Sequence, residues 1–336
     1  MQKLNYLLVL CFFIFAGCIT QYKPPAAAGK TTEVIVLCND ANWTEISDLI
    51  PKVLEREIYT PTTEKVFDIK KVLPSEINKY KYRKNCLVLG IVGDEIIDSL
   101  LAKSAMKKLL AGEEYMFGGQ DFFVKGQFFL IIAAPTIYKL KEIIENKSDV
   151  VFNYFVENVA KTIKNDLYKD GYQKTVSEKL LKDYGFTISV PRGWKVVEEK
   201  IGFVELARHS PDRFISICWE TTPLNATTEL NLNAAIEFRN KIGVKYYDGD
   251  YVDTTFAKFY QVNFHNSLAG KLDGIWQNDE QVMGGPFKTY FISAEGRLYT
   301  IDMHIFAPGY KKWKFLQQLE LIIDTFSFLS ENKQIT

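Results

Sequence analysis

The sequence predicts two domains of different fold class: an α/β domain with a mixed or mostly parallel sheet, then an α+β domain with an antiparallel sheet and packed helices. In residues 33–172, runs that are apolar throughout, such as EVIVLC at 33–38 and FFLIIA at 128–133, alternate with helical patterns. Strands of this kind are typical of sheets covered on both faces. In residues 173–330, apolar and polar residues alternate and the strands follow one another as hairpins.

The elements of the first domain follow from local signals. Asn39-Asp40 supplies a candidate N-cap for a helix that continues to about Arg56. Apolar residues at helical spacing predict a helix over residues 94–110, which Gly112 is suited to end. Further helices are expected after Pro135 and over residues 151–163, and strands at 33–38, 66–72, 85–92 and 128–133.

The second domain is expected to consist mainly of strands. A helix is predicted over residues 230–242, and a closing helix over 311–324 whose Phe315, Leu319 and Ile322 form the core stripe. Strands are expected at residues 184–190, 203–207, 214–219, 257–264, 272–277, 288–293 and 298–306.

The first eighteen residues have the pattern of a bacterial lipoprotein signal. Lys3 precedes an apolar run over residues 7–15, which is shorter than the roughly 20 residues of a membrane-spanning helix, and small residues then precede Cys18. We therefore predict that residues 1–17 are removed and that Cys18 carries lipid, with residues 18–32 as a tether. An ordinary signal peptide is the alternative. By resemblance to better-known lipoproteins, the lack of Asp after Cys18 predicts an outer-membrane location facing the periplasm.

Composition excludes some classes of partner. Lys+Arg and Asp+Glu balance at 41 each, so nucleic-acid binding is not expected. Three cysteines follow the signal, Cys38, Cys86 and Cys218, and we expect them to pack as buried thiols. Cys38 and Cys86 both lie in expected strands of the first domain and are the candidates for neighbours. The histidines show no metal-ligand spacing, so neither a metal nor a cofactor is expected.

Two groups of side chains are candidates for a site. Cys38, Asn39 and Asp40 stand at the carboxyl end of an expected buried strand, where open α/β sheets bind ligands. The interpretation we favour for them is a buried thiol beside a helix cap. Asp302 and His304 share one face of a strand and can form a carboxylate–imidazole pair. Polar residues on the solvent face of the strand are the alternative.

Aromatic side chains offer a third kind of site. Trp276 and Phe287 are candidates for stacking on a glycan, and the Asn278-Asp279 loop, expected to be hydrated, would supply hydrogen bonds. Packing in the core is the favoured alternative, because large aromatic residues bury much area. Residues 284–286, Gly-Gly-Pro, are expected to form a tight turn with positive φ that tucks Phe287 inward.

Several segments carry a family resemblance. Residues 274–276 (GIW), 283–287 (MGGPF) and 307–309 (APG), together with residues 30–40 and Trp43, resemble the Bacteroidota lipoproteins grouped as domain of unknown function 4837. That resemblance supports the lipid anchor and implies no activity. Two further segments of the second domain, a strand ending in Pro-Arg-Gly-Trp and a closing helix that runs into Thr-Phe-Ser-Phe, are similar to PsbP-like and Mog-type domains, which are mostly adaptor or assembly modules.

These observations predict a lipid-anchored protein of the cell envelope that acts as a non-enzymatic binding or assembly component. Its expected partners are the membrane, through the lipid, and an envelope protein or glycan. The alternative is an envelope hydrolase with its site near Cys38–Asp40 or at Asp302 and His304.

Overall fold

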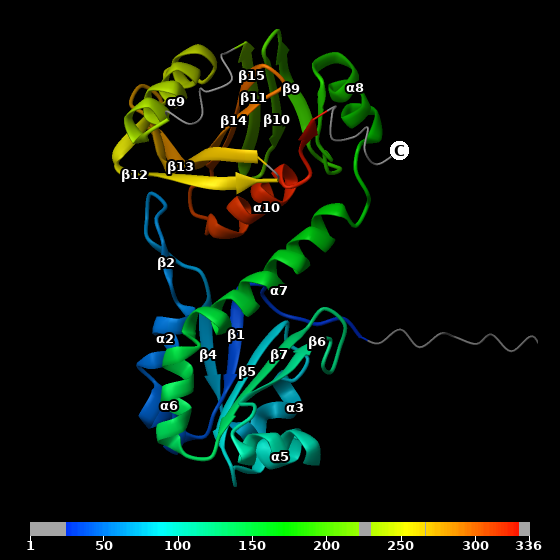
Figure 1. Ribbon diagram of the computed structural model, residues 1–336, viewed down its shortest axis with the longest axis vertical. Helices are drawn as coiled ribbons and strands as arrows, with labels where there is room; N and C mark the ends of the chain where they lie inside the picture. The colour runs from blue at the N-terminus through cyan, green and yellow to red at the C-terminus, as the bar shows by residue number, and fades with distance from the viewer. Residues whose placement is uncertain (1–24, 222–229, 266, 329–336) are drawn as a thin grey trace, which may run out of the picture.

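The computed structural model describes residues 25–221, 230–265 and 267–328, which form two domains stacked along the long axis (Figure 1). The predicted signal peptide and Cys18 lie outside the described residues. The predicted fold classes are confirmed: the first domain has a mixed, mostly parallel sheet between helices, and the second has an antiparallel sheet with packed helices.

The first domain is a sheet covered on both faces. Its strands are β1 (Glu33–Leu37), β4 (Asp68–Val72), β5 (Asn85–Ile91), β6 (Met116–Gln120) and β7 (Phe128–Ala134). Within the described residues their order is β4-β1-β5-β7-β6, and only β6 runs antiparallel to its neighbour. One face packs against α1 (Asp40–Ile46), α2 (Leu49–Leu54), α6 (Ile137–Asn146) and α7 (Ser148–Tyr168). The other packs against α3 (Ile77–Tyr80), α4 (Glu95–Leu100) and α5 (Lys103–Ala111), with the 3₁₀ turn η1 (Pro74–Glu76) before α3.

Two helices predicted as continuous are broken. The segment that was expected to run to Arg56 divides into α1 and α2, because Pro51 has no N–H to bond to the preceding turn and is tolerated only near a helix start. The segment over residues 94–110 divides into α4 and α5, where Leu101 and Ala102 adopt extended backbone angles. Gly112 ends α5 in the left-handed conformation, as predicted.

The last residues of the predicted tether lie against the first domain. The Ala27 N–H donates to the Lys125 carbonyl and the Ala28 N–H to the Tyr82 carbonyl, each at 2.9 Å. The span between Cys18 and the body of the domain is therefore shorter than residues 18–32.

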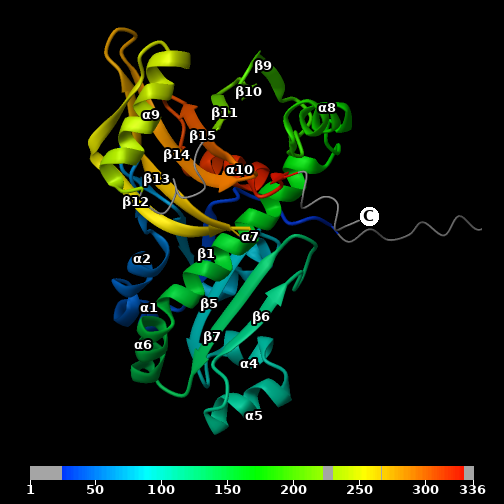
Figure 2. The ribbon, with the colours of Figure 1, turned by 45° about the horizontal axis from the view of Figure 1, so that its top comes forward.

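The second domain is an antiparallel sheet between helices. Its strands are β9 (Lys195–Lys200), β10 (Phe203–Arg208), β11 (Asp212–Thr221), β12 (Tyr251–Phe264), β13 (Ser267–Asn278), β14 (Met283–Ala294) and β15 (Arg297–Phe306). Their order within the described chain is β12-β13-β14-β15-β11-β10-β9. The helices α8 (Lys174–Tyr184) and α10 (Trp313–Ile323) pack on one face, together with the short pair β8 (Phe186–Thr187) and β16 (Ser327–Phe328). The helix α9 (Leu232–Tyr246) packs on the other (Figures 1 and 2).

Two expectations for this domain are wrong, and one strand was missed. The strand predicted at residues 184–190 is reduced to β8, because the unpredicted helix α8 extends to Tyr184 and Gly185 ends it in the left-handed conformation. The core stripe of α10 uses Leu316 beside Leu319 and Ile322, while Phe315 is half-buried. Strand β9, at the edge of the sheet, was also not predicted.

The Gly-Gly-Pro segment is not the tight turn that was expected. It lies within β14, and neither Gly284 nor Gly285 has positive φ. Glycine is required there by close packing, because a Cβ atom on Gly285 would lie 1.8 Å from the Ile305 carbonyl oxygen. Phe287 does point inward, as predicted, and is buried.

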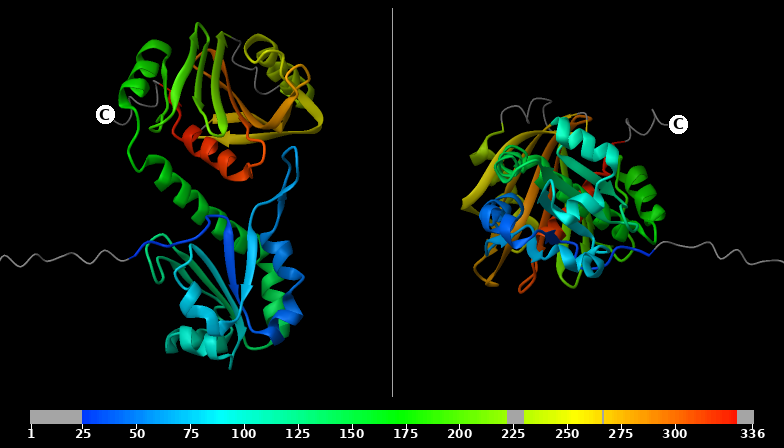
Figure 3. Two further views of the ribbon diagram at one scale, coloured as in Figure 1. Left: turned by 180° about the vertical axis from the view of Figure 1, so that it is seen from behind. Right: turned by 90° about the horizontal axis from the view of Figure 1, so that it is seen from below.

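The domains are joined by α7 and by an arm, residues 57–65, which reaches from the first domain to the second (Figures 1 and 3). The arm carries the short strands β2 (Glu57–Ile58) and β3 (Glu64–Lys65). At its base, one Glu64 carboxylate oxygen accepts a hydrogen bond from the Lys312 N–H at 2.6 Å, and the other lies 3.1 Å from Lys312 Nζ. Trp313 packs in the core of the first domain, with its ring 5.8 Å from that of Phe67.

We expect Glu64→Ala to lower the free energy of unfolding by about 3 kcal/mol, because it leaves the buried Lys312 ammonium without its charged partner and removes the acceptor at the start of α10. Urea titration measures this loss. Glu64→Gln, which keeps an acceptor, should lose less. The matched control is Glu114→Ala, which breaks an exposed ion pair with Lys108 and should cost less than about 1 kcal/mol. Equal losses for Glu64→Ala and Glu114→Ala would contradict the role assigned to Glu64.

Candidate ligand pocket and its polar floor

The first predicted site lies where the strand order of the first sheet reverses, at the ends of β1 and β5. Asn39 is the N-cap of α1, as predicted, and its side-chain amide donates to Asp94 Oδ1 at 2.9 Å. The Asn42 amide and the Ile91 N–H donate to Asp94 Oδ2 at 2.7 and 2.8 Å. The polar groups at this point are therefore bonded to one another.

The cysteines near this sheet are poor nucleophiles. Cys38 is fully buried, and burial, followed by the charge of Asp94, raises the pKa of its thiol to about 12. Cys86 is also buried, and burial raises its pKa to about 12. Both are free thiols, and strand register pairs Cys86 with Ile35 rather than with Cys38. Asp40 is exposed and forms an ion pair with Lys71.

The other predicted site residues gather in the second domain, between α9 and the sheet. Asp302 and His304 are buried and do not lie on a solvent face, because the strand face they share is the one that α9 covers. The His304 Nδ1 atom lies 3.2 Å from Asp302 Oδ2, so the predicted carboxylate–imidazole pair is present. The Thr289 hydroxyl bonds to the other Asp302 oxygen.

An arginine that sequence reasoning missed completes this cluster. Arg239, on α9, is 0% exposed, and its Nη2 atom lies 3.5 Å from Asp302 Oδ2. Its guanidinium nitrogens make no hydrogen bond within the described residues. The guanidinium instead lies over the rings of Phe287 and Tyr247, at 4.9 and 5.4 Å from their centroids. An arginine within the apolar stripe Ala235, Ile236 and Ile242 was the signal that could have revealed it.

The aromatic candidates belong to the same cluster. Phe287 supports Arg239, and Trp276 is buried with its indole N–H donating to the Ile305 carbonyl at 3.3 Å. The Asn278 side chain is buried rather than hydrated, since it donates to Asp250 Oδ1 at 2.9 Å and to the Asp248 carbonyl. Trp276 and Phe287 are therefore core residues, as the favoured alternative held.

The Asp302 carboxylate is the most strongly held charge of the cluster. Burial raises the pKa of Asp302, but the Arg239 charge, the His304 ring and the Thr289 hydroxyl together outweigh burial and lower the pKa to about 2. The carboxylate therefore stays ionised at neutral pH with its oxygens already engaged.

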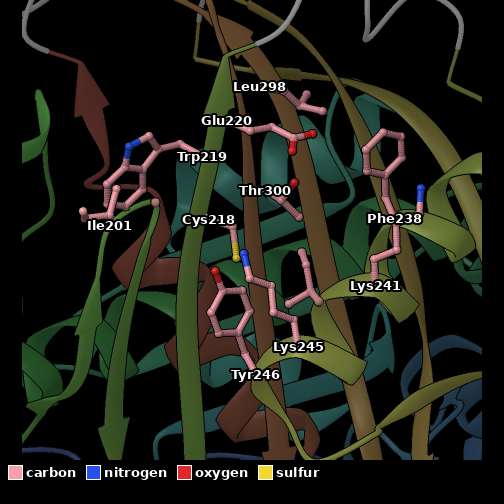
Figure 4. A pocket seen from close by; sticks show the side chains of 12 residues that line it. Ile201, Cys218, Trp219, Glu220, Phe238, Lys241, Lys245, Tyr246, Leu298 and Thr300 are labelled. Atoms are coloured by element: carbon pink, nitrogen blue, oxygen red, sulfur yellow. The ribbon is translucent and has the colours of Figure 1, made fainter.

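An open pocket of about 250 Å³ lies next to this cluster, against the same face of the sheet. Its floor is formed by Cys218 on β11 and Thr300 on β15, which pair with each other in the sheet. The pair Ser216 and Asp302 lies two positions further along the same two strands. Phe238 and Tyr246 supply aromatic side chains, and Lys241 and Lys245 project from α9 (Figure 4). Glu220 is the acidic group of the lining.

The side chains of the pocket are suited to binding a charged ligand rather than to nucleophilic catalysis. Tyr246 raises the pKa of Lys245, so the amine is protonated at neutral pH. Burial, and then the charge of Asp302, raise the pKa of the Cys218 thiol, which opposes the thiolate form needed for nucleophilic attack. Among the described residues, no group of three or more His, Cys, Asp and Glu side chains is placed to hold a metal ion.

Comparison with known protein families divides the chain between residues 168 and 173, which is also where the two structural domains meet in the sequence. Residues 173–325 match the family described as Domain of unknown function (DUF4837). The predicted resemblance is thus confirmed for the second domain, and its GIW, MGGPF and APG segments fall within the match, whereas the segment 30–40 and Trp43, which were assigned to the same family, lie outside it. Residues 27–168, which include the segment 30–40 and Trp43, match a second family, Domain of unknown function (DUF8532). Both descriptions leave the function of the two domains unknown, and a search of curated proteins finds no match.

Solved structures that align with part of this chain include the cyanobacterial PsbP protein of Synechocystis, at 16% identity, covering 43% of this chain and 86% of that one with a TM-score of 0.32. LpqN of Mycobacterium tuberculosis, described as involved in cell envelope biogenesis, aligns at 12% identity over 43% of this chain and 85% of its own, with a TM-score of 0.28. A structure from Bacteroides thetaiotaomicron aligns at 10% identity, and the match spans 43% of this chain and 45% of that one, with a TM-score of 0.29.

We expect Asp302→Asn to lower the free energy of unfolding by about 3 kcal/mol at pH 7, because Arg239 loses its buried partner. The folded-state pKa of Asp302 lies below its unfolded value, so its stabilisation is present above pH 4 to 5 and is lost as the pH falls toward 2. The gap between wild type and variant should therefore shrink by about 2 kcal/mol over that range. Urea titrations at several pH values measure it. Asp149→Asn, at an exposed ion pair, is the control and should show a small, nearly constant gap.

Proposed function

We propose that the protein is a lipid-anchored, non-enzymatic component of the cell envelope that binds a small anionic ligand in the pocket beneath α9. The observation that carries this proposal is the pocket itself, which is lined by the aromatic side chains of Phe238 and Tyr246 and by two lysines. Pockets of this construction, apolar with a few placed polar groups, are the usual form of a ligand site.

The charges of the lining define the class of ligand. Lys241 and Lys245 contribute two positive charges and Glu220 one negative charge, which leaves one positive charge for a ligand to balance. Phe238 and Tyr246 offer apolar surface to the rest of the molecule. The volume of about 250 Å³ is slightly below the usual range of roughly 300–1,000 Å³ for small-molecule sites. A short monoanionic amphiphile, such as a medium-chain carboxylate, fits these properties.

The hydrolase alternative has less support. The thiols of Cys38 and Cys218 have raised pKa values, and the Asp302 carboxylate is engaged by Arg239, His304 and Thr289. None of these groups has the activation that nucleophilic catalysis requires.

The membrane location rests on the predicted lipid at Cys18. Among the described residues, no helix has both the length and the apolar character to cross a membrane. We propose that the acylated protein resides in the outer membrane and faces the periplasm, where stable anchoring requires more than one acyl chain.

Octanoate tests the pocket. Isothermal titration calorimetry with the mature chain should show that octanoate binds more tightly than octan-1-ol, because the carboxylate pairs with the lysines. Lys245→Met should weaken octanoate binding by about tenfold and leave octan-1-ol binding unchanged. Lys107→Met, an exposed lysine of the first domain, is the matched control and should change neither affinity. Equal affinity of wild type for the acid and the alcohol would refute an anion-binding pocket.

Metabolic labelling with a palmitate analogue tests the anchor. In a bacterial host that processes lipoproteins, the full-length protein should be labelled and sediment with membranes, whereas Cys18→Ala should be unlabelled. Cys11→Ala, a change within the predicted signal, should keep the label. The lipid-anchor proposal fails if Cys18→Ala stays membrane-associated after export with its signal removed.

A further inference from the structure

A second cavity lies where the arm, residues 57–65, meets the outer strands of the second domain. It has a volume of about 260 Å³ and is bounded by the arm, by β12 to β14 and by the start of α10. It is separate from the α9 pocket, since the two share no lining residue and lie on opposite faces of the sheet. Its lining residues come from both domains, and the arm of the first domain reaches the second domain in Figures 1 and 3.

Exposed aromatic rings form one wall of this cavity. Tyr59, on the arm, is 58% exposed, and Tyr260 and Phe256, on β12, are 45% and 36% exposed. The Tyr59 and Phe256 rings lie 5.7 Å apart. Aromatic rings on a strand normally gain stability by burial, so three accessible rings at one cavity indicate a surface that a ligand can cover.

A carboxylate with one unpaired oxygen among the described residues forms part of the opposite wall. Asp273 lines the cavity and its side chain is 32% exposed. Its Oδ1 atom is buried and accepts no hydrogen bond within the described residues, and the nearest ammonium, that of Lys271, is 3.8 Å away. Lys271 and Lys288 instead bond to Glu320 Oε1, at 3.1 and 2.6 Å.

The cavity carries no net charge. Glu57 and Asp273 supply two negative charges, and Lys258 and Lys288 supply two positive charges. A ligand suited to this lining is neutral, has an apolar face for the rings and has hydroxyl groups to donate to Asp273.

We infer that this cavity binds a neutral pyranose unit of a glycan, with its C–H face against Tyr59, Phe256 and Tyr260 and a hydroxyl donating to Asp273. The inference goes beyond the function proposed for the α9 pocket. The ring chemistry is common to peptidoglycan and to other envelope polysaccharides, and the acetamido group of the former distinguishes the two sources.

Two disaccharides provide the test, N,N′-diacetylchitobiose and cellobiose, each titrated to about 10 mM against the mature chain by saturation-transfer NMR and calorimetry. Ring C–H protons of at least one sugar should receive saturation. Tyr59→Ala and Tyr260→Ala should each weaken binding about tenfold, and Asp273→Asn should also weaken it. Tyr138→Ala, an 81% exposed tyrosine of the first domain, is the matched control and should bind as wild type does.

Each result of these titrations either supports the inference or overturns it. Binding of chitobiose alone supports the site and assigns it to acetamido sugars, whereas binding of both sugars supports it through the ring alone. Absence of binding to either sugar, or binding that Tyr59→Ala and Tyr260→Ala leave intact, overturns the inference. Octanoate affinity, which depends on Lys245, should be unchanged in Tyr59→Ala and shows that the variant remains folded.

Discussion

The carboxylate of Glu64 is the contact on which the arrangement of the two domains depends. It belongs to the first domain, yet it accepts from the first backbone N–H groups of α10, whose own N-cap, Lys312, provides no capping side chain. Helix starts leave N–H groups that need an acceptor, and a negative charge is favoured there. The next residue, Trp313, fills the core of the first domain, and Leu316 and Leu319 fill that of the second. One helix thus belongs to both cores.

The two cavities depend on this interface to different degrees. The α9 pocket is formed by the second domain alone, from α9 and strands of its sheet. The other cavity needs Tyr59 of the arm beside Phe256 of β12, and the arm is held in place at its base by Glu64. Any rearrangement of the domains would therefore alter the aromatic cavity first, whereas the lysine-lined pocket would be preserved.

The sequence was sufficient to predict a strand or helix where the residues of that element alone formed a clear pattern. The apolar runs at 33–38, 85–92 and 128–133 correspond to β1, β5 and β7, because buried parallel strands are apolar on both faces. The arm was not predicted, since β2 and β3 have two residues each and no periodicity. Asp302 and His304 were recognised as a pair, but alternation alone does not say which face of a strand is buried. Which face of this strand is buried is seen only with Arg239, which lies on α9, a helix distant from the strand in the sequence.

The buried ion pair also determines how α9 presents its lysines. Arg239 lies on the buried side of the helix, where Asp302 is its ion-pair partner. Turning or sliding α9 would leave a guanidinium in the core without compensation, at a cost that apolar contacts do not recover. Lys241 and Lys245, one helical turn apart on one side of α9, are thereby held over the pocket. Arg239 and Asp302, which line no part of the pocket, thus position the two lysines that we propose bind the ligand.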